Sequence, residues 1–189
     1  MAVTAKGEAR KLTLRQRKGR AVNAVAEMLR KRLSVPNIYL EPRSHYIAAD
    51  VLAVDRAGAG DLHAVEIKLD RDFERNPVSP EFDPKGWMLH VREMMRDLPK
   101  QLVETPAHYK YLAVPHDSWD LLSGELGPVL YSPDGVGRIG IILIVDRGED
   151  APVAEVKVAP ERFRVDAVKL GNVEKKLLQK VRPDMEVRI

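Results

Sequence analysis

Two carboxylates and one lysine stand out because they lie within apolar segments. Asp50 belongs to the segment 46–55, and Glu66 and Lys68 belong to the segment 62–69. Ionised side chains are costly to bury unless they are paired or bind a metal, and two facing carboxylates repel each other. A divalent cation satisfies both carboxylates, and oxygen ligands suit Mg²⁺ or Mn²⁺ better than zinc. A lysine beside such an ion can activate a metal-held water or stabilise charge on a phosphate, so these residues predict a magnesium site with hydrolytic chemistry.

The three side chains meet only if the two segments pair as an antiparallel hairpin. Glycines in the connection 56–60 allow the backbone angles of a tight turn, which favours such pairing. If Asp55 lies opposite Asp61, then Asp50 lies opposite Glu66, and directly opposed side chains share one face of the sheet. A slip of one residue would move Asp50 to the other face. Apolar residues on both faces predict a central hairpin that is covered on both sides.

A purely structural interpretation of the same residues stays open. Lys68 can bridge Asp50 and Glu66 as an ion-paired end of the hairpin, without metal and without catalysis. The direct opposition of two carboxylates in apolar surroundings favours the metal site over this alternative.

The other elements are predicted from the periodicity of apolar residues and from turn signals. Apolar residues at spacings of three and four predict a helix over 13–33, before the hairpin. After the hairpin we expect a polar, proline-rich loop at 71–86, helices at 87–98, 118–122 and 172–181, and strands at 109–114, 139–145 and 154–158. This order predicts a single α/β domain over 13–189, with a central mixed β-sheet flanked by helices, after a basic, loosely ordered segment 1–12.

The N-terminal part of the chain is strongly basic. Residues 1–33 contain ten Lys and Arg against two Glu, whereas the whole chain has a net charge of only +3. Such a cluster favours a polyanionic partner, because neutralising phosphates releases counterions, and a solvated helix face is the alternative interpretation. The candidate phosphate-binding residues are Arg15, Arg17, Lys18 and Arg20 in the first helix, Arg92 and Arg96 in the helix 87–98, and Lys100, which follows at the same four-residue spacing just beyond Pro99.

Several classes of protein and site are excluded by composition. The chain has no cysteine, which excludes disulfides, thiolate zinc sites and a cysteine nucleophile. The longest apolar run, at 139–145, is too short to span a bilayer, and residues 1–20 lack the apolar stretch of a secretory signal. We therefore expect a cytoplasmic protein without a membrane partner.

Asp50, a spacer of fifteen residues and then Glu66-Ile67-Lys68 resemble the core motif of the PD-(D/E)XK nuclease superfamily, whose fold is restriction-endonuclease-like. The predicted order of elements over residues 19–146 is similar as well. In this family the Asp and Glu side chains and the carbonyl between Glu and Lys bind the metal. The resemblance therefore implies that Asp50, Glu66 and the Ile67 carbonyl bind Mg²⁺, with Mn²⁺ as an alternative. It also implies that Lys68 positions or activates the attacking water.

Many members of this family add a glutamate from the first helix. Glu27 is the acid in this helix that could take that role, and Asn23, one turn earlier, is the other candidate for the aligned position. If Asn23 holds the position, the site has lost one acid and a weak or altered activity is expected. A second departure is Ala49, which stands where the family often has proline.

The expected function is therefore that of a metal-dependent nuclease acting on nucleic acid, with DNA preferred, in repair, recombination or defence. The resemblance also allows a homodimer, because double-strand cleavage often needs two sites. The main alternative is a noncatalytic nucleic-acid-binding or protein-interaction module on the same fold, in which the acids persist as structural ion pairs.

Overall fold

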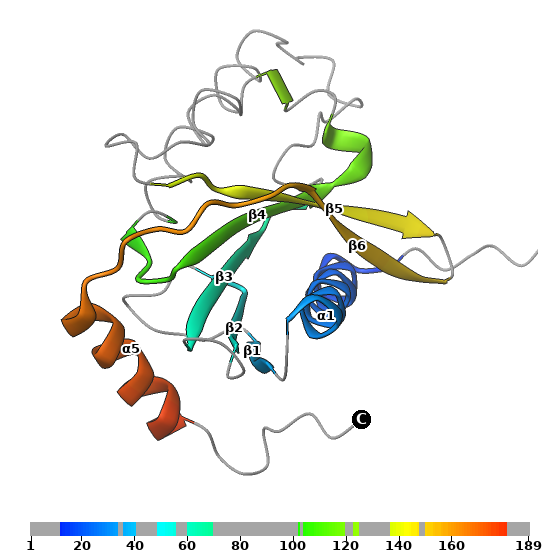
Figure 1. The fold of residues 1–189 in the computed structure, drawn as a ribbon. Helices are drawn as coiled ribbons and strands as arrows, with labels where there is room; N and C mark the ends of the chain where they lie inside the picture. Colours follow the sequence, from blue (N-terminus) through cyan, green and yellow to red (C-terminus); the bar gives the residue numbers. More distant parts are fainter. Residues whose placement is uncertain are drawn as a thin grey trace, which may run out of the picture.

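In the computed structural model, the described residues form an α/β fold around a mixed sheet of six strands (Figure 1). Each strand lies beside its successor in the chain, in the order β1-β2-β3-β4-β5-β6. The elements are α1 Leu14–Arg32, β1 Pro36–Leu40, β2 Val51–Asp55, β3 Asp61–Ile67, β4 Tyr109–Pro115, the 3₁₀ helix η1 His116–Ser118, β5 Gly140–Arg147, β6 Asp150–Val158 and α5 Ala167–Lys180. The predicted α/β class and the mixed sheet are confirmed.

The structure describes residues 12–33, 36–40, 49–55, 60–69, 102, 104–119, 123–124, 137–147 and 150–180. Several predictions lie outside these residues: the segment 1–12 apart from Leu12, the loop 71–86, the helix 87–98 with Arg92 and Arg96, and Lys100 beyond it. The short helix predicted at 118–122 begins two residues earlier as η1, and residues 120–122 are not among those described.

The centre of the sheet is buried on both faces. β4 pairs in parallel with β3 and β5, whereas the β1–β2, β2–β3 and β5–β6 pairs are antiparallel. Strands in a parallel arrangement are usually covered on both faces, so they appear in the sequence as continuous apolar runs. Residues 111–114 and 141–143 are at most 2% exposed, which is why β4 and β5 can be predicted without an alternating pattern.

α1 covers one face of the sheet and begins at a capping box. The Thr13 side chain accepts a hydrogen bond from the Gln16 backbone N–H, and the Gln16 side chain accepts one from the Thr13 N–H. Val22, Val25 and Leu29 on one stripe of the helix are buried in the core. Figure 1 shows α1 beneath the sheet, between β1 and β6. The helix predicted over 13–33 is confirmed, and no described helix is long and apolar enough to cross a membrane.

α5 packs on the other face of the hairpin. Val173 and Leu177 belong to one buried cluster with Leu52, Leu62 and Ala64 of β2 and β3. Four odd-numbered residues of the same two strands belong instead to the core between the sheet and α1, namely Val51, Ala53, Val65 and Ile67. This alternation confirms that the hairpin is covered on both sides, as the sequence predicts.

α5 begins at Ala167, five residues before the predicted start at 172. Asp166 caps the helix, because its Oδ1 accepts hydrogen bonds from the backbone N–H groups of Val168 (2.8 Å) and Lys169 (3.1 Å). These two bonds also lower the pKa of the Asp166 carboxyl. The first turn was missed because its apolar residue Val168 faces solvent, at 73% exposure, and so does not continue the buried stripe on which the prediction relied.

The two edge strands were the least visible in the sequence. β1, which begins at Pro36, was not predicted, and in the described part of the chain it pairs with β2. β6 begins at Asp150, four residues before the predicted strand 154–158. Edge strands tolerate proline and keep one side in solvent, so they carry a weaker apolar signal.

The buried histidine His63 makes the stability of the fold depend on pH. The residue is 5% exposed, and its ring stacks on Tyr109, with 4.7 Å between ring centroids. Burial lowers the pKa of His63 to about 4, against an opposing effect of the Asp61 carboxylate.

Between about pH 6.5 and pH 4, the unfolded chain therefore binds a proton that the folded chain refuses. As the pH is lowered from about 6.5 to 4, we expect the free energy of unfolding to fall by about 3 kcal/mol because of His63 alone. Urea titrations of the wild type and of His63→Phe at a series of pH values measure this difference. A pH dependence that is identical in the two proteins would contradict the assignment to His63.

Candidate functional site

The hairpin of β2 and β3 has the register that the sequence predicts. Asp55 lies opposite Asp61, and the pairing continues to Val51 opposite Val65. Before Val51 the chain leaves this ladder at Asp50, whose backbone N–H donates to the Val65 carbonyl at 2.8 Å. β2 therefore starts later than the predicted strand 46–55, of which residues 46–48 lie outside the described residues.

The Asp50 side chain replaces a backbone partner at the end of β3. Its Oδ2 accepts a hydrogen bond from the Ile67 backbone N–H at 2.8 Å. A short acidic side chain can compete in this way with backbone groups of a sheet. The Asp50 carboxylate is consequently held at the carboxyl end of β3, with 13% of its side chain exposed.

Glu66 and Lys68 stand at the same end of the hairpin. The Lys68 Nζ lies 2.9 Å from Glu66 Oε1, and the two side chains are 24% and 15% exposed, respectively. The backbone N–H of Lys68 donates to the Ala113 carbonyl, whereas Pro115, further along β4, has no N–H to extend the ladder. β3 therefore ends at Ile67, two residues before the predicted end.

The two carboxylates are close enough to influence each other. Burial, and after it the charge of Asp50, raise the pKa of Glu66, while Lys68 and Lys18 oppose the increase. The convergence of Asp50, Glu66 and Lys68 that the sequence predicts is therefore present in the structure. Their roles in chemistry stay predictions.

A second lysine, Lys18 of α1, completes the cluster. Its Nζ lies 2.7 Å from Asp50 Oδ1, and its side chain is 40% exposed. Lys18 precedes Val22 and Val25 by four and seven residues, so it lies on the buried stripe of α1 that faces the sheet. Lys18 is predicted from the sequence to bind phosphate. The periodicity of α1 places it on the face of the helix toward the sheet, and the packing of the helix brings it to Asp50.

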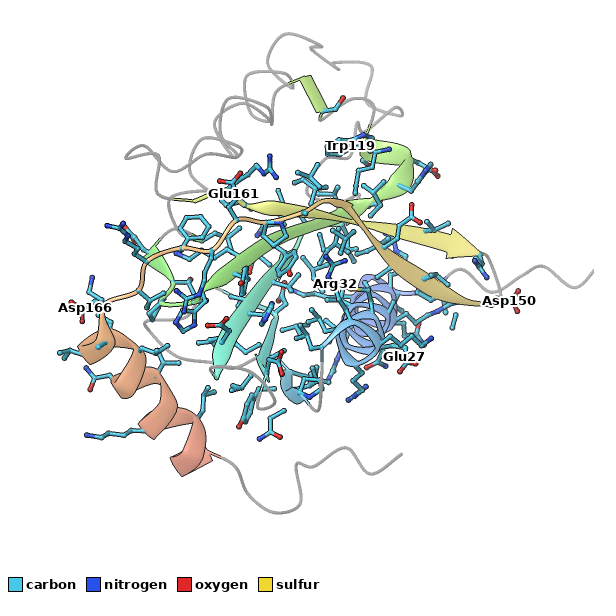
Figure 2. All side chains as sticks on the ribbon, viewed as in Figure 1. Glu27, Arg32, Trp119, Asp150, Glu161 and Asp166 are labelled. Atoms are coloured by element: carbon cyan, nitrogen blue, oxygen red, sulfur yellow. The ribbon has the colours of Figure 1, made fainter. Side chains whose placement is uncertain are left out.

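The structure does not bring the expected acid of the first helix to the cluster. Glu27 follows Lys18 by nine residues, which places it roughly 180° around the helix. Its side chain is 52% exposed, pairs with Lys31 at 3.2 Å, and projects from the outer side of α1 (Figure 2). Glu27 and the alternative Asn23 both line an open groove of about 690 Å³ between α1 and β6. The direction in which each side chain leaves the helix decides which one reaches the hairpin. The side chain of α1 that contacts Asp50 is therefore Lys18 and not Glu27.

The other basic residues of α1 point in different directions. Arg15 is exposed, and Arg17 is partly buried. Arg20 lines the groove beside β6, and its Nη2 donates to the Asp150 carbonyl. Of the basic side chains predicted as one phosphate-binding set, Lys18 thus joins the carboxylate cluster, Arg20 lines the groove and Arg15 is exposed.

The donor set of the cluster fits a hard divalent cation. Asp50 and Glu66 supply carboxylate oxygens, and the Ile67 carbonyl faces the same side of β3 as its N–H, toward Asp50. Mg²⁺ is often bound through one or two carboxylates, with water filling the remaining positions. Among the described residues no group of three or more His, Cys, Asp or Glu could hold a metal ion. The cluster therefore offers a pair of carboxylates for Mg²⁺ and no third acid from α1.

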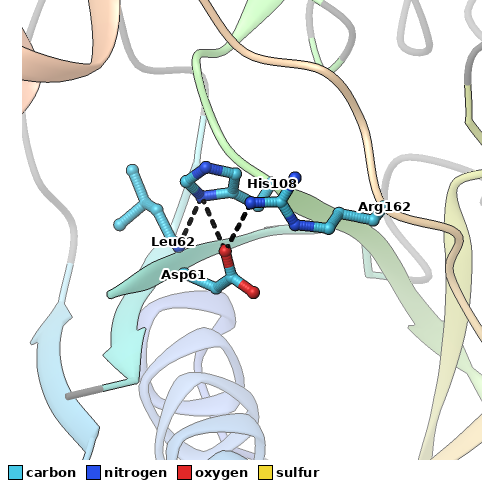
Figure 3. Close-up of polar contacts among 4 residues, drawn as sticks. All are labelled: Asp61, Leu62, His108 and Arg162. Atoms are coloured by element: carbon cyan, nitrogen blue, oxygen red, sulfur yellow. Dashed lines mark hydrogen bonds and ion pairs between the residues drawn. The ribbon is translucent and has the colours of Figure 1, made fainter. Parts of the chain in front are cut away.

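A second polar cluster, at the start of β3, is structural in character (Figure 3). The Nδ1 of the buried His108 accepts a hydrogen bond from the Leu62 backbone N–H at 3.0 Å, so the neutral ring carries its proton on Nε2. Arg162 Nη2 donates to Asp61 Oδ1 at 2.9 Å, and this bond lowers the pKa of Asp61. The cluster ties the segment before α5 to the hairpin.

Comparison with known proteins assigns no family and no function to this chain. No protein-family model and no curated protein matches the chain. Among solved structures it is similar to the SPO1766 protein of unknown function from Silicibacter pomeroyi, with 16% sequence identity and a TM-score of 0.46. The alignment covers 93% of this chain and 96% of that chain. A likeness at this level assigns neither a fold family nor a function.

Proposed function

We propose that this protein is a metal-dependent nuclease with a restriction-endonuclease-like fold. It hydrolyses phosphodiester bonds of nucleic acid, and DNA is the proposed substrate. The observation that carries the proposal is the meeting of Asp50, Glu66 and Lys68 at one end of a central, doubly covered hairpin. Hard oxygen donors next to an ammonium group suit the metal-assisted cleavage of a phosphodiester.

Each residue of the cluster has a distinct role in this proposal. Asp50 and Glu66 hold Mg²⁺, or Mn²⁺, together with the Ile67 carbonyl. The bound ion supplies Lewis acidity and lowers the pKa of a coordinated water. Lys68, positioned against Glu66 at 2.9 Å, orients the attacking water or neutralises charge that develops on the phosphate.

The basic side chains bind the substrate backbone. Arg15 and Arg17 of α1, near the N-terminal cluster of positive charge, are proposed to contact phosphates, and Arg92, Arg96 and Lys100 retain that proposed role from the sequence. Phosphate contacts carry affinity without sequence information, so a structure-directed or nonspecific nuclease fits better than a site-specific one.

A noncatalytic nucleic-acid-binding module on the same fold is the second candidate, and one observation favours it. Both carboxylates of the cluster have an ammonium partner within the chain, Lys18 for Asp50 and Lys68 for Glu66. Such a set of ion pairs is balanced in charge without a metal.

Metal titration followed by thermal melting separates the two candidates. If the cluster holds Mg²⁺, the wild type should be stabilised by about 2.7 kcal/mol at roughly 100 times the dissociation constant, and Asp50→Asn should lose this response. Asparagine at this position removes the charge but keeps an oxygen that can accept from the Ile67 N–H, so the hairpin is preserved. Cleavage of single-stranded, duplex and branched DNA and RNA, with Mg²⁺, Mn²⁺ or EDTA, then tests the activity itself. Binding without cleavage, and without a metal response, would support the noncatalytic module instead.

A further inference from the structure

The Lys18 ammonium occupies the oxygen of Asp50 through which a metal would have to bind. Asp50 Oδ2 is already engaged by the backbone N–H of Ile67 at 2.8 Å, and that bond holds the end of the hairpin. A metal can therefore reach the Asp50 carboxylate through Oδ1 without breaking the structure. Lys18 Nζ lies 2.7 Å from this same Oδ1.

A metal and the Lys18 ammonium compete at this oxygen through charge repulsion. A magnesium ion binds carboxylate oxygen at about 2.1 Å, so an ammonium that stayed 2.7 Å from Oδ1 would lie within roughly 5 Å of the ion. Like charges at that separation, in a partly buried place, repel strongly. From this geometry we propose that Lys18 is a built-in competitor of the divalent cation, which leaves Asp50 when the metal binds. This inference rests on the proposed function, since it concerns the same site.

Of the two lysines, Lys18 is the one that can move. It projects from a helix, its side chain is 40% exposed, and solvent is available to receive the ammonium. Lys68 is 24% exposed and follows β3 directly, where its backbone N–H bonds to Ala113. Lys68 contacts Oε1 of Glu66, which leaves Oε2 of that carboxylate for the metal, whereas the second oxygen of Asp50 accepts the Ile67 N–H. Lys68 can therefore stay beside Glu66, while Lys18 exchanges with the metal.

The exchange has a measurable consequence for metal affinity. Without metal, two ammonium groups balance the two carboxylates of the cluster. Each metal ion that binds must first release the Lys18–Asp50 pair, so the site binds metal more weakly than its oxygen donors alone would allow. The protein would consequently need a higher concentration of divalent metal for half-saturation. An uncharged residue at position 18 should lower that concentration.

Isothermal titration calorimetry with Mg²⁺ and with Mn²⁺ tests the proposal directly on the full chain. Lys18→Met, which keeps an unbranched side chain one atom shorter and removes the charge, should bind metal at least about tenfold more tightly. Lys18→Arg, which keeps the charge, should bind like the wild type. Lys31→Met is the matched control, because Lys31 is also on α1 but pairs with Glu27 away from the cluster.

The outcomes also separate this inference from the proposed nuclease. Metal binding in Lys18→Met that is unchanged or weaker, with metal-dependent cleavage retained by the wild type, would overturn the competitor role alone. Absence of metal binding in the wild type and in every variant would overturn both. Thermal melting without metal provides a second readout: Lys18→Met should melt at a lower temperature than Lys18→Arg, because Asp50 loses its cationic partner.

Discussion

Replacing Glu66 by glutamine is expected to reduce metal-dependent cleavage of nucleic acid by at least about a hundredfold. Glutamine has the same shape but lacks the charge, so it weakens metal binding and leaves Lys68 without its anionic partner at 2.9 Å. Both effects act at the reacting phosphate, and the loss should appear in kcat as well as in the metal concentration that gives half-maximal activity. Initial cleavage rates over a range of Mg²⁺ concentrations measure both quantities.

The matched control for Glu66→Gln is Glu155→Gln, an exposed glutamate on β6. This variant should cleave like the wild type, because it changes the net charge of the protein by the same amount at a distance from the cluster. Thermal melting of both variants checks that the fold is retained. Cleavage by Glu66→Gln at the rate of the control would contradict the proposed active site.

Truncation of Leu29 to alanine is expected to reduce the free energy of unfolding by about 2–5 kcal/mol. Leu29 is fully buried on α1, in the cluster that joins this helix to the central strands of the sheet. The substitution removes apolar burial and leaves a cavity that the surrounding strands can only partly close. Urea denaturation at neutral pH, analysed with the slope of the transition as a check on two-state unfolding, measures the effect.

Val168→Ala serves as the exposed counterpart of Leu29→Ala. Val168 also lies on a helix, but its side chain is 73% exposed, so its truncation should change stability by about 0.5 kcal/mol or less. A cost for Leu29→Ala as small as that of Val168→Ala would mean that α1 does not pack on the sheet as described.

The pairing of the hairpin could be predicted from the sequence because it depends on local information. Alternation of apolar residues and a short glycine-containing connection determine which residues of β2 and β3 lie opposite each other. For the same reason the sequence was sufficient to bring Asp50, Glu66 and Lys68 together. The central strands β4 and β5 and the helix α1 were also predictable, since burial leaves a strong apolar pattern.

Only the tertiary structure decided which residue of α1 meets the hairpin. The azimuth and height of a helix on a sheet depend on how its whole buried stripe packs, so a search for an acid in α1 identified Glu27, whereas packing brings Lys18 to Asp50. The departure of Asp50 from the strand depends likewise on a hydrogen bond to Ile67, seventeen residues away. Sequence pattern thus determined the chemistry available at the hairpin, whereas long-range packing and hydrogen bonding decided which cation stands beside it.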